Sequence, residues 1–110
     1  MKKRIYLSGP ISGHDLELTC KKFKQIQTLL EADGYTVFNP MENGLPPESS
    51  THAHMHRDLA VLTNEDIPFY AIFMMRGWLH SKGCKLEFDV ATAIGLQVIF
   101  EETGTEIKFA

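Results

Sequence analysis

Short apolar runs that alternate with longer helical patterns constrain the fold of this chain more than any other feature. Each run is rich in strand-forming residues and is stopped by glycine, proline or polar residues. The runs span 4–8, 35–38, 67–74 and 96–100. The intervening segments repeat apolar residues about every 3.6 positions, as amphipathic helices do. These segments are Leu16–Asp33, His52–Asn64 and Cys84–Ile94.

This alternation predicts an α/β fold, because strands separated by helices pair in parallel through right-handed crossovers. We expect a three-layer flavodoxin-like sandwich with a four- or five-stranded mainly parallel sheet, the fifth strand being 106–109. Asp15 and Gly34 are expected to cap the first helix at its two ends. Pro68 has to lie at the beginning of its strand, because proline cannot donate to the ladder. A length of 110 residues suits one core, so residues 1–110 should form a single domain.

The composition argues against several classes of function. The net charge is −3 and the basic residues form no long face, which argues against a nucleic-acid polymer as partner. No run of about 18 apolar residues is present, so no membrane partner is expected. The apolar run after Met1–Arg4 is too short for a signal peptide, and Cys20 and Cys84 have neither metal nor redox spacing. Reduced thiols in a cytoplasmic protein are the simplest interpretation.

Three loops are expected at the carboxyl ends of the strands, where folds of this class bind ligands. They are Ser8–His14, Asn39–Thr51 and Met75–Gly83. Residues 41–51 form a long segment rich in glycine, proline and serine, which makes them a candidate lid. A functional site is therefore expected among these loops and the helices that follow them.

Glu87 is the most informative acid in the chain. With Gly83 counted as the cap, Glu87 lies about four residues into the third helix and shares a face with Ala91 and Ile94. We expect this face to pack on the sheet, so the carboxyl group would point toward the loops and not toward bulk water. The alternative is that Glu87 only complements the helix dipole.

A second acid and a tyrosine are expected near the same place. Asp58 lies inside the second helix, where a solvated or arginine-paired acid is the ordinary alternative. Glycosidic chemistry, however, uses two carboxyl groups in different environments, one as nucleophile and the other as acid or base. Tyr6 lies late in the first strand, where its hydroxyl would orient a carboxylate; otherwise it is a core aromatic.

Loop residues supply candidates for substrate contacts. Ser8–Gly13 and Ser81–Gly83 each precede a helix, so their backbone N–H groups can bind a phosphate; ordinary tight connections are the alternative. Trp78 is either a wall against a flat base or sugar, or an anchor for its loop. The alternating histidines of 52–56 cannot all reach one metal ion from a helix, and no metal is expected.

These motifs together resemble a known superfamily. The most specific is the Ser-x-Gly-x-x-x-Glu spacing that ends at Glu87. The others are Ile5–Gly13, Asn39-Pro40, Arg57-Asp58, Gly77-Trp78, Ala91 and Gly95. The chain resembles, over nearly its whole length, the nucleoside 2-deoxyribosyltransferase superfamily and, within it, the small DUF4406 branch. The 2'-deoxynucleoside 5'-monophosphate N-hydrolases are similar relatives.

The resemblance implies a role for each motif. Glu87 would be the nucleophile, Tyr6 would hold it, and Asp58 would be catalytic as well. Ser81 would contact a 5'-phosphate. The implied substrate contacts are Ser8, Gly9, Ser12, Gly13, Trp78, Ser81 and Gly83. No cofactor is implied, the partner is a small-molecule nucleoside or nucleotide, and a homodimer or higher homo-oligomer is expected because family members borrow a residue from a neighbouring subunit.

The leading hypothesis is cleavage or transfer at the N-glycosidic bond of a 2'-deoxynucleoside or its 5'-monophosphate, through a covalent glycosyl-Glu87 intermediate. Asp58 or a water would protonate the departing base, and water or a second base would take the sugar. The alternative is a non-catalytic nucleotide-binding or sensor domain of the same fold. It is favoured by Arg76–Lys82, which lacks the acid that the transferases carry. The hydrolases often carry Arg where this chain has Ser12, which counts against a phosphate contact there. A dimerisation module with a vestigial site is a third interpretation.

Overall fold

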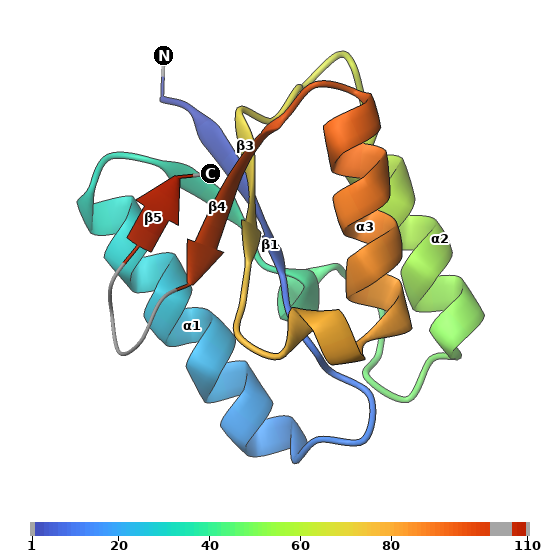
Figure 1. Cartoon of the computed structure of the whole chain (residues 1–110). Helices are drawn as coiled ribbons and strands as arrows, with labels where there is room; N and C mark the ends of the chain where they lie inside the picture. Colours follow the sequence, from blue (N-terminus) through green and yellow to red (C-terminus); the bar gives the residue numbers. More distant parts are fainter. Residues whose placement is uncertain (1, 102–106, 110) are drawn as a thin grey trace.

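The computed structural model describes residues 2–101 and 107–109, and its elements follow the predicted alternation (Figure 1). This part of the chain contains five strands, three α-helices and two short 3-10 turns. In chain order they are β1 (Arg4–Ser8), α1 (Leu16–Ala32), β2 (Thr36–Phe38), η1 (Pro40–Glu42), α2 (Thr51–Leu62), β3 (Ala71–Met74), η2 (Trp78–His80), α3 (Lys82–Ala93), β4 (Gln97–Glu101) and β5 (Ile107–Phe109).

The sheet has the strand order β2-β1-β3-β4-β5. The first four strands are parallel, and β5 runs antiparallel to β4. This order is that of flavodoxin-like folds, so the predicted α/β class and mainly parallel sheet are confirmed. The fifth strand covers Ile107–Phe109 of the predicted 106–109, and residue 106 lies outside the described residues.

Helices cover both faces of the sheet, which gives the three layers. In Figure 1, α1 lies on one face, while α2 and α3 lie side by side on the other. Side chains of a strand alternate between the faces. Ile5 and Leu7 of β1 therefore pack in the core under α1, whereas Tyr6 packs in the core under α2 and α3. Ser8 follows Tyr6 by two positions and takes the same side.

The first helix has the predicted caps. The carboxylate of Asp15 accepts a hydrogen bond from the backbone N–H of Leu18 at 2.9 Å. Gly34 follows the helix end with φ +96°, a left-handed conformation that favours glycine. Within the described residues, no helix is both long and apolar enough to cross a membrane.

The third helix begins earlier than predicted. It starts at Lys82, and its N-cap is Ser81, whose Oγ accepts from the backbone N–H of Cys84 at 3.2 Å. The prediction that Gly83 is the cap was therefore wrong, because a serine hydroxyl can satisfy a free N–H group and glycine has no side chain to do so. Glu87 is consequently deeper in the helix than predicted.

Two apolar residues expected in packed elements are exposed. Ile94, predicted to pack on the sheet, is 50% exposed, because α3 ends before it and the chain turns away at Gly95. The strand predicted over 67–74 is shorter and spans Ala71–Met74, so Ile67 and Pro68 precede it on the surface.

Candidate active site

Glu87 lies on the buried face of α3, at the carboxyl end of β1. It shares that face with Cys84 and Ala91, three residues before it and four after it, as the helical period requires. Only 8% of the residue is exposed. A carboxyl group in such a place needs hydrogen-bond partners, because burying an unpaired charge is costly.

Two hydroxyl groups of β1 supply these partners. The Tyr6 hydroxyl donates to Glu87 Oε2 at 2.5 Å, and the Ser8 hydroxyl donates to Oε1 at 2.6 Å. Both donors lie on the same side of β1, because they are two positions apart in a strand. Each carboxylate oxygen therefore has its own donor, and the orientation of the carboxylate is fixed by the sheet.

The electrostatics of Glu87 follow from this burial. Loss of solvation raises the pKa of Glu87 to about 7, although the hydrogen bonds from Ser8 and Tyr6 oppose the rise. The nearby negative charge of Asp58 raises the pKa further. Burial, followed by the charges of Glu87 and Asp58, raises the pKa of Tyr6 well above its ordinary value. Tyr6 therefore keeps its proton and remains a donor to Glu87 at any physiological pH.

Asp58 lies on α2, the helix beside α3, and is also only 8% exposed. Burial raises its pKa, and three groups oppose that rise: the side-chain amide of Asn43, then the charges of His54 and Arg57. Its charge acts on both Tyr6 and Glu87, so the two carboxyl groups belong to one electrostatic unit. The structure thus brings together the three residues that the sequence singled out as catalytic.

Asn43 completes this group and was not among the residues predicted for the site; the turn-forming dipeptide Asn43-Gly44 is its only local signal. Its side-chain Nδ2 donates to Asp58 Oδ1 at 2.9 Å, and Arg57 Nη1 donates to its backbone oxygen at 3.0 Å. The residue is 7% exposed. The segment 41–51, predicted to be a lid, is therefore attached to α2 at this point.

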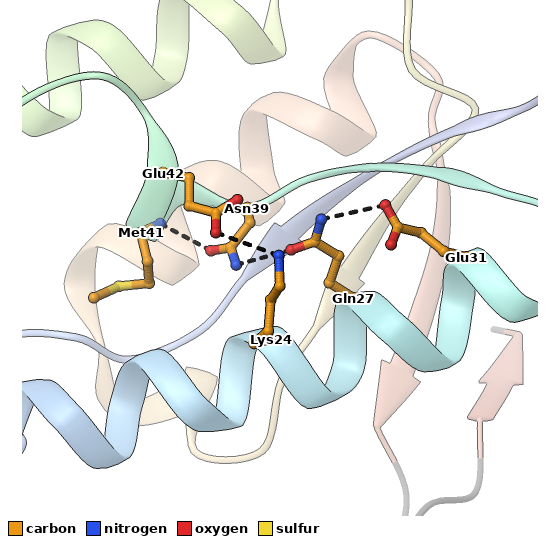
Figure 2. Close-up of polar contacts among 6 residues, drawn as sticks. All are labelled: Lys24, Gln27, Glu31, Asn39, Met41 and Glu42. Atoms are coloured by element: carbon orange, nitrogen blue, oxygen red, sulfur yellow. Dashed lines mark hydrogen bonds and ion pairs between the residues drawn. The ribbon is translucent and has the colours of Figure 1, made fainter.

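The start of this segment and Asn39, which precedes it, are attached to α1 (Figure 2). Asn39 Nδ2 donates to Gln27 Oε1 at 3.1 Å, and Asn39 Oδ1 accepts from the backbone N–H of Met41 at 2.9 Å. Lys24 and Glu42 form an ion pair at 3.5 Å, with both side chains more than half exposed. Such an exposed pair contributes at most about 1 kcal/mol, so the buried Asn39 amide is the firmer attachment.

Comparison with known families places the whole site inside one of them. The family described as "Domain of unknown function (DUF4406)" matches residues 3–100. The chain belongs to the DUF4406 family. The matched range holds Tyr6, Asn43, Asp58 and Glu87, and it ends before β5. No curated protein matches the chain.

The first loop of the DUF4406 domain contributes two kinds of residue. Ser12 and Gly13 form an exposed turn beyond β1, with Gly13 at φ +80°. Ser8 and Gly9, also expected to contact substrate, are buried. Ser8 is 1% exposed and is bonded to Glu87. A Cβ on Gly9 would lie 2.7 Å from the sulfur of Met75, so packing alone accounts for glycine there.

The loop before α3 has structural tasks of its own. Ser81 caps the helix, as described above, and Gly83 faces α2, where an added Cβ would lie 3.2 Å from Cε of Met55. Trp78 stacks on Phe88 at 4.9 Å and on Phe100 at 5.9 Å between ring centroids. This stack is the anchor that the sequence offered as one of two interpretations of Trp78.

Cys84, for which the sequence indicated neither a metal nor a redox role, is a further member of the site. It is free and buried, at 2% exposure. Burial raises the pKa of its thiol, and hydrogen bonds with Ser8 and Ser81 oppose the rise. A thiol that keeps its proton is a weak nucleophile, so Glu87 is the better candidate for attack.

Proposed function

We propose that this DUF4406 domain cleaves or transfers at the N-glycosidic bond of a 2'-deoxynucleoside or its 5'-monophosphate, through a covalent intermediate on Glu87. The observation that carries the proposal is the pair of hydroxyl donors, Tyr6 and Ser8, on the two oxygens of this buried carboxylate. A nucleophile has to be held in one orientation for attack, whereas a carboxylate that only stabilises a helix needs no such support.

The proposed reaction has two steps. In the first, a Glu87 oxygen bonds to the anomeric carbon, the bond to the base breaks, and its electron pair leaves with the base nitrogen. Asp58 gives a proton to that base. In the second step, water or a second base attacks the anomeric carbon, Asp58 takes back a proton, and Glu87 is released as a carboxylate.

The environments of the two acids differ. The charge of Asp58 raises the pKa of Glu87, so Asp58 ionises first in the free protein, and the division above requires that Asp58 take up a proton when substrate binds. Glu87, with a pKa of about 7, is substantially ionised at neutral pH and has two donors that favour the ionised form. Asp58 has a raised pKa and a single side-chain donor on one oxygen, Asn43, which leaves the other oxygen for a proton. Two carboxyl groups in different surroundings are what glycosidic chemistry uses.

The proposal also includes membership of the nucleoside 2-deoxyribosyltransferase superfamily, a homodimer or higher homo-oligomer, and a cytoplasmic location. The Ser-x-Gly-x-x-x-Glu spacing of Ser81, Gly83 and Glu87 supports the first of these. Light scattering of the purified chain tests the oligomeric state.

A non-catalytic nucleotide-binding or sensor domain is the second candidate function. Residues 76–82 contain no acid that could hold a sugar hydroxyl, and Trp78 is already packed on two aromatic rings. A binding domain, however, has no need of a buried carboxylate with two orienting hydroxyl groups.

Base release separates the two functions. The protein is incubated with each 2'-deoxynucleoside and each 5'-monophosphate, and free base is followed by chromatography. Glu87→Gln is run alongside, with Glu48→Gln, an exposed acid of the long loop, as the matched control. Base release that is lost in Glu87→Gln but kept in Glu48→Gln supports the enzymatic function. Nucleotide binding by calorimetry without release of any base supports the sensor. A second base added as acceptor distinguishes transfer from hydrolysis.

A further inference from the structure

The side-chain amide of Asn43 has a defined orientation. Its Oδ1 accepts the backbone N–H of Leu45 at 3.0 Å, so the NH2 end has to point the other way, toward α2. There, Nδ2 lies 2.9 Å from Asp58 Oδ1 and 3.2 Å from His54 Nδ1. An amide NH2 group only donates, so Asp58 Oδ1 is an acceptor, and His54 Nδ1 accepts while the imidazole is neutral.

The main chain of Asn43 is held as firmly as its side chain. Arg57 Nη1 donates to the Asn43 carbonyl oxygen at 3.0 Å. The next residue, Gly44, has φ +88°, and a Cβ there would lie 3.3 Å from the same guanidinium nitrogen. The turn at Asn43-Gly44 thus packs against Arg57, and this contact holds the Asn43 amide in position to donate to Asp58.

This geometry distinguishes the two oxygens of Asp58. Oδ1 accepts a hydrogen bond from Asn43 Nδ2, so the lone pair that faces this donor cannot carry a proton. A proton on Oδ2 leaves this hydrogen bond intact, so the geometry favours Oδ2 as the protonated oxygen. The other charged or titratable groups that act on Asp58 or on which it acts are His54 and Arg57 of α2, Glu87 of α3 and Tyr6 of β1.

We infer that Asn43 is a positioning residue for Asp58: by holding Oδ1 as an acceptor, it makes Oδ2 the oxygen that exchanges the proton with the substrate base. This inference rests on the proposed function. It assigns to the segment 41–51 a task in proton transfer in addition to any covering of the site. Asn43 itself touches no reacting atom and acts only through Asp58.

The first test needs no activity and no change to Asn43. Nuclear magnetic resonance follows the side-chain NH2 signals of Asn43 and the side-chain carboxyl carbon of Asp58 as pH is varied. The expected result is that the Asn43 signals shift with the same midpoint as the Asp58 carboxyl carbon, and that this shift is absent in Asp58→Asn. Asn43 NH2 signals whose chemical shifts do not change as Asp58 titrates would overturn the inference.

The second test removes the donor. Asn43→Ala should raise the pKa of Asp58 by about one pH unit, because a hydrogen bond to the ionised form is lost. Asn39→Ala is the matched control, since Asn39 is a buried asparagine just before the segment 41–51 and bonds to Gln27 and not to Asp58. A purely structural role predicts lower stability in both variants and an unchanged pKa of Asp58 in both.

Base release completes the design. With the proposed activity present, Asn43→Ala should lower kcat/KM about tenfold and move its pH profile, while Asn39→Ala leaves the profile in place. An inactive wild type with Asn43 signals coupled to Asp58 rejects the proposed function and keeps the hydrogen-bond assignment. An active enzyme with uncoupled signals rejects the role of Asn43 and keeps the function.

Discussion

The hydroxyl of Tyr6 donates a 2.5 Å hydrogen bond to Oε2 of Glu87, a residue 81 positions further along the chain. The ring of Tyr6 is fixed by a stacked contact with Phe38 at 5.2 Å and an edge contact with Phe69 at 5.6 Å. The position of the Glu87 carboxylate is therefore set by the sheet and its aromatic core, and not only by the helix that carries it.

Replacing Tyr6 with Phe tests this relationship, because the ring packing is kept and only the hydroxyl is lost. The pKa of Glu87 should rise above its value of about 7, since a donor to the ionised form is removed. If Glu87 is the nucleophile, kcat/KM for base release near neutral pH should fall about ten- to a hundredfold, and its acidic limb should move to higher pH. The side-chain carbon signal of Glu87 measures the pKa directly.

Tyr70→Phe is the control for Tyr6→Phe. Tyr70 is half-buried, and its ring, which the substitution keeps, lies under the ammonium group of Lys3 on the α1 side of the sheet. This variant should leave the titration of Glu87 unchanged. An unchanged titration in Tyr6→Phe would show that the hydroxyl does not hold the carboxylate.

Glu87 should also make the stability of the domain depend on pH. Its pKa is about 7 in the folded protein against 4.5 for the ordinary side chain, so the folded state binds its proton more tightly than the unfolded state does. The neutral Glu87 side chain makes its full contribution to the free energy of unfolding below about pH 4.5, and this contribution is lost as pH rises to about 7. The loss amounts to about 3 kcal/mol.

The Glu87→Gln variant isolates this contribution, because the amide cannot ionise. Its free energy of unfolding, minus that of the wild type, should increase from pH 4.5 to pH 7 and stay level above that range. Urea unfolding at several pH values measures the difference, in which the titration of the histidines cancels. A difference that is constant with pH would mean that Glu87 is ionised as easily as an exposed acid.

The meeting of Tyr6 and Glu87 could be predicted because it follows from the helical and strand periods, whereas Asp58 was selected by the chemistry and the family resemblance. The helical period places Glu87 on the face of Ala91, and the parallel order of the strands places the end of β1 beside that helix. The strand period also puts Ser8 on the side of Tyr6, so its bond to Glu87 was within reach of the same reasoning. The catalytic roles of these residues stay predictions.

Other features depend on contacts that no local pattern encodes. Asn43 reaches Asp58 only because the loop folds back under Arg57, and a turn-forming dipeptide gives no partner for its side chain. At the start of α3, Ser81 and Gly83 are both acceptable caps by residue type, and the free N–H of Cys84 decides between them. Trp78 finds Phe88 and Phe100 through tertiary packing between α3 and β4.

Gly9 should be intolerant of any side chain for reasons of packing. A Cβ would lie 2.7 Å from Sδ and 3.0 Å from Cβ of Met75, and 3.0 Å from Cζ of Phe23. Gly9→Ala should therefore lower the free energy of unfolding by about 1–3 kcal/mol, as overpacking does. Gly83→Ala is the matched control: its Cβ meets the flexible end of Met55 at 3.2 Å inside a helix, where alanine is favoured. Equal stability of the two variants would contradict the packing explanation.

Ser81 has two possible tasks, and three substitutions separate them. As the N-cap of α3, its Oγ accepts from Cys84 N, and its hydroxyl proton can be donated either to the Cys84 sulfur or to a phosphate. Ser81→Ala should lose about 1 kcal/mol of stability, whereas Ser81→Asp and Ser81→Thr should keep most of the cap.

The aspartate, however, would repel a phosphate group, while the threonine retains the hydroxyl. If Ser81 also contacts the 5'-phosphate, Ser81→Asp remains stable but binds the 5'-monophosphate at least about tenfold more weakly, with the parent nucleoside unaffected. Calorimetric titration with both ligands decides the point, and wild-type affinity for the monophosphate in Ser81→Asp would leave Ser81 with the structural task alone.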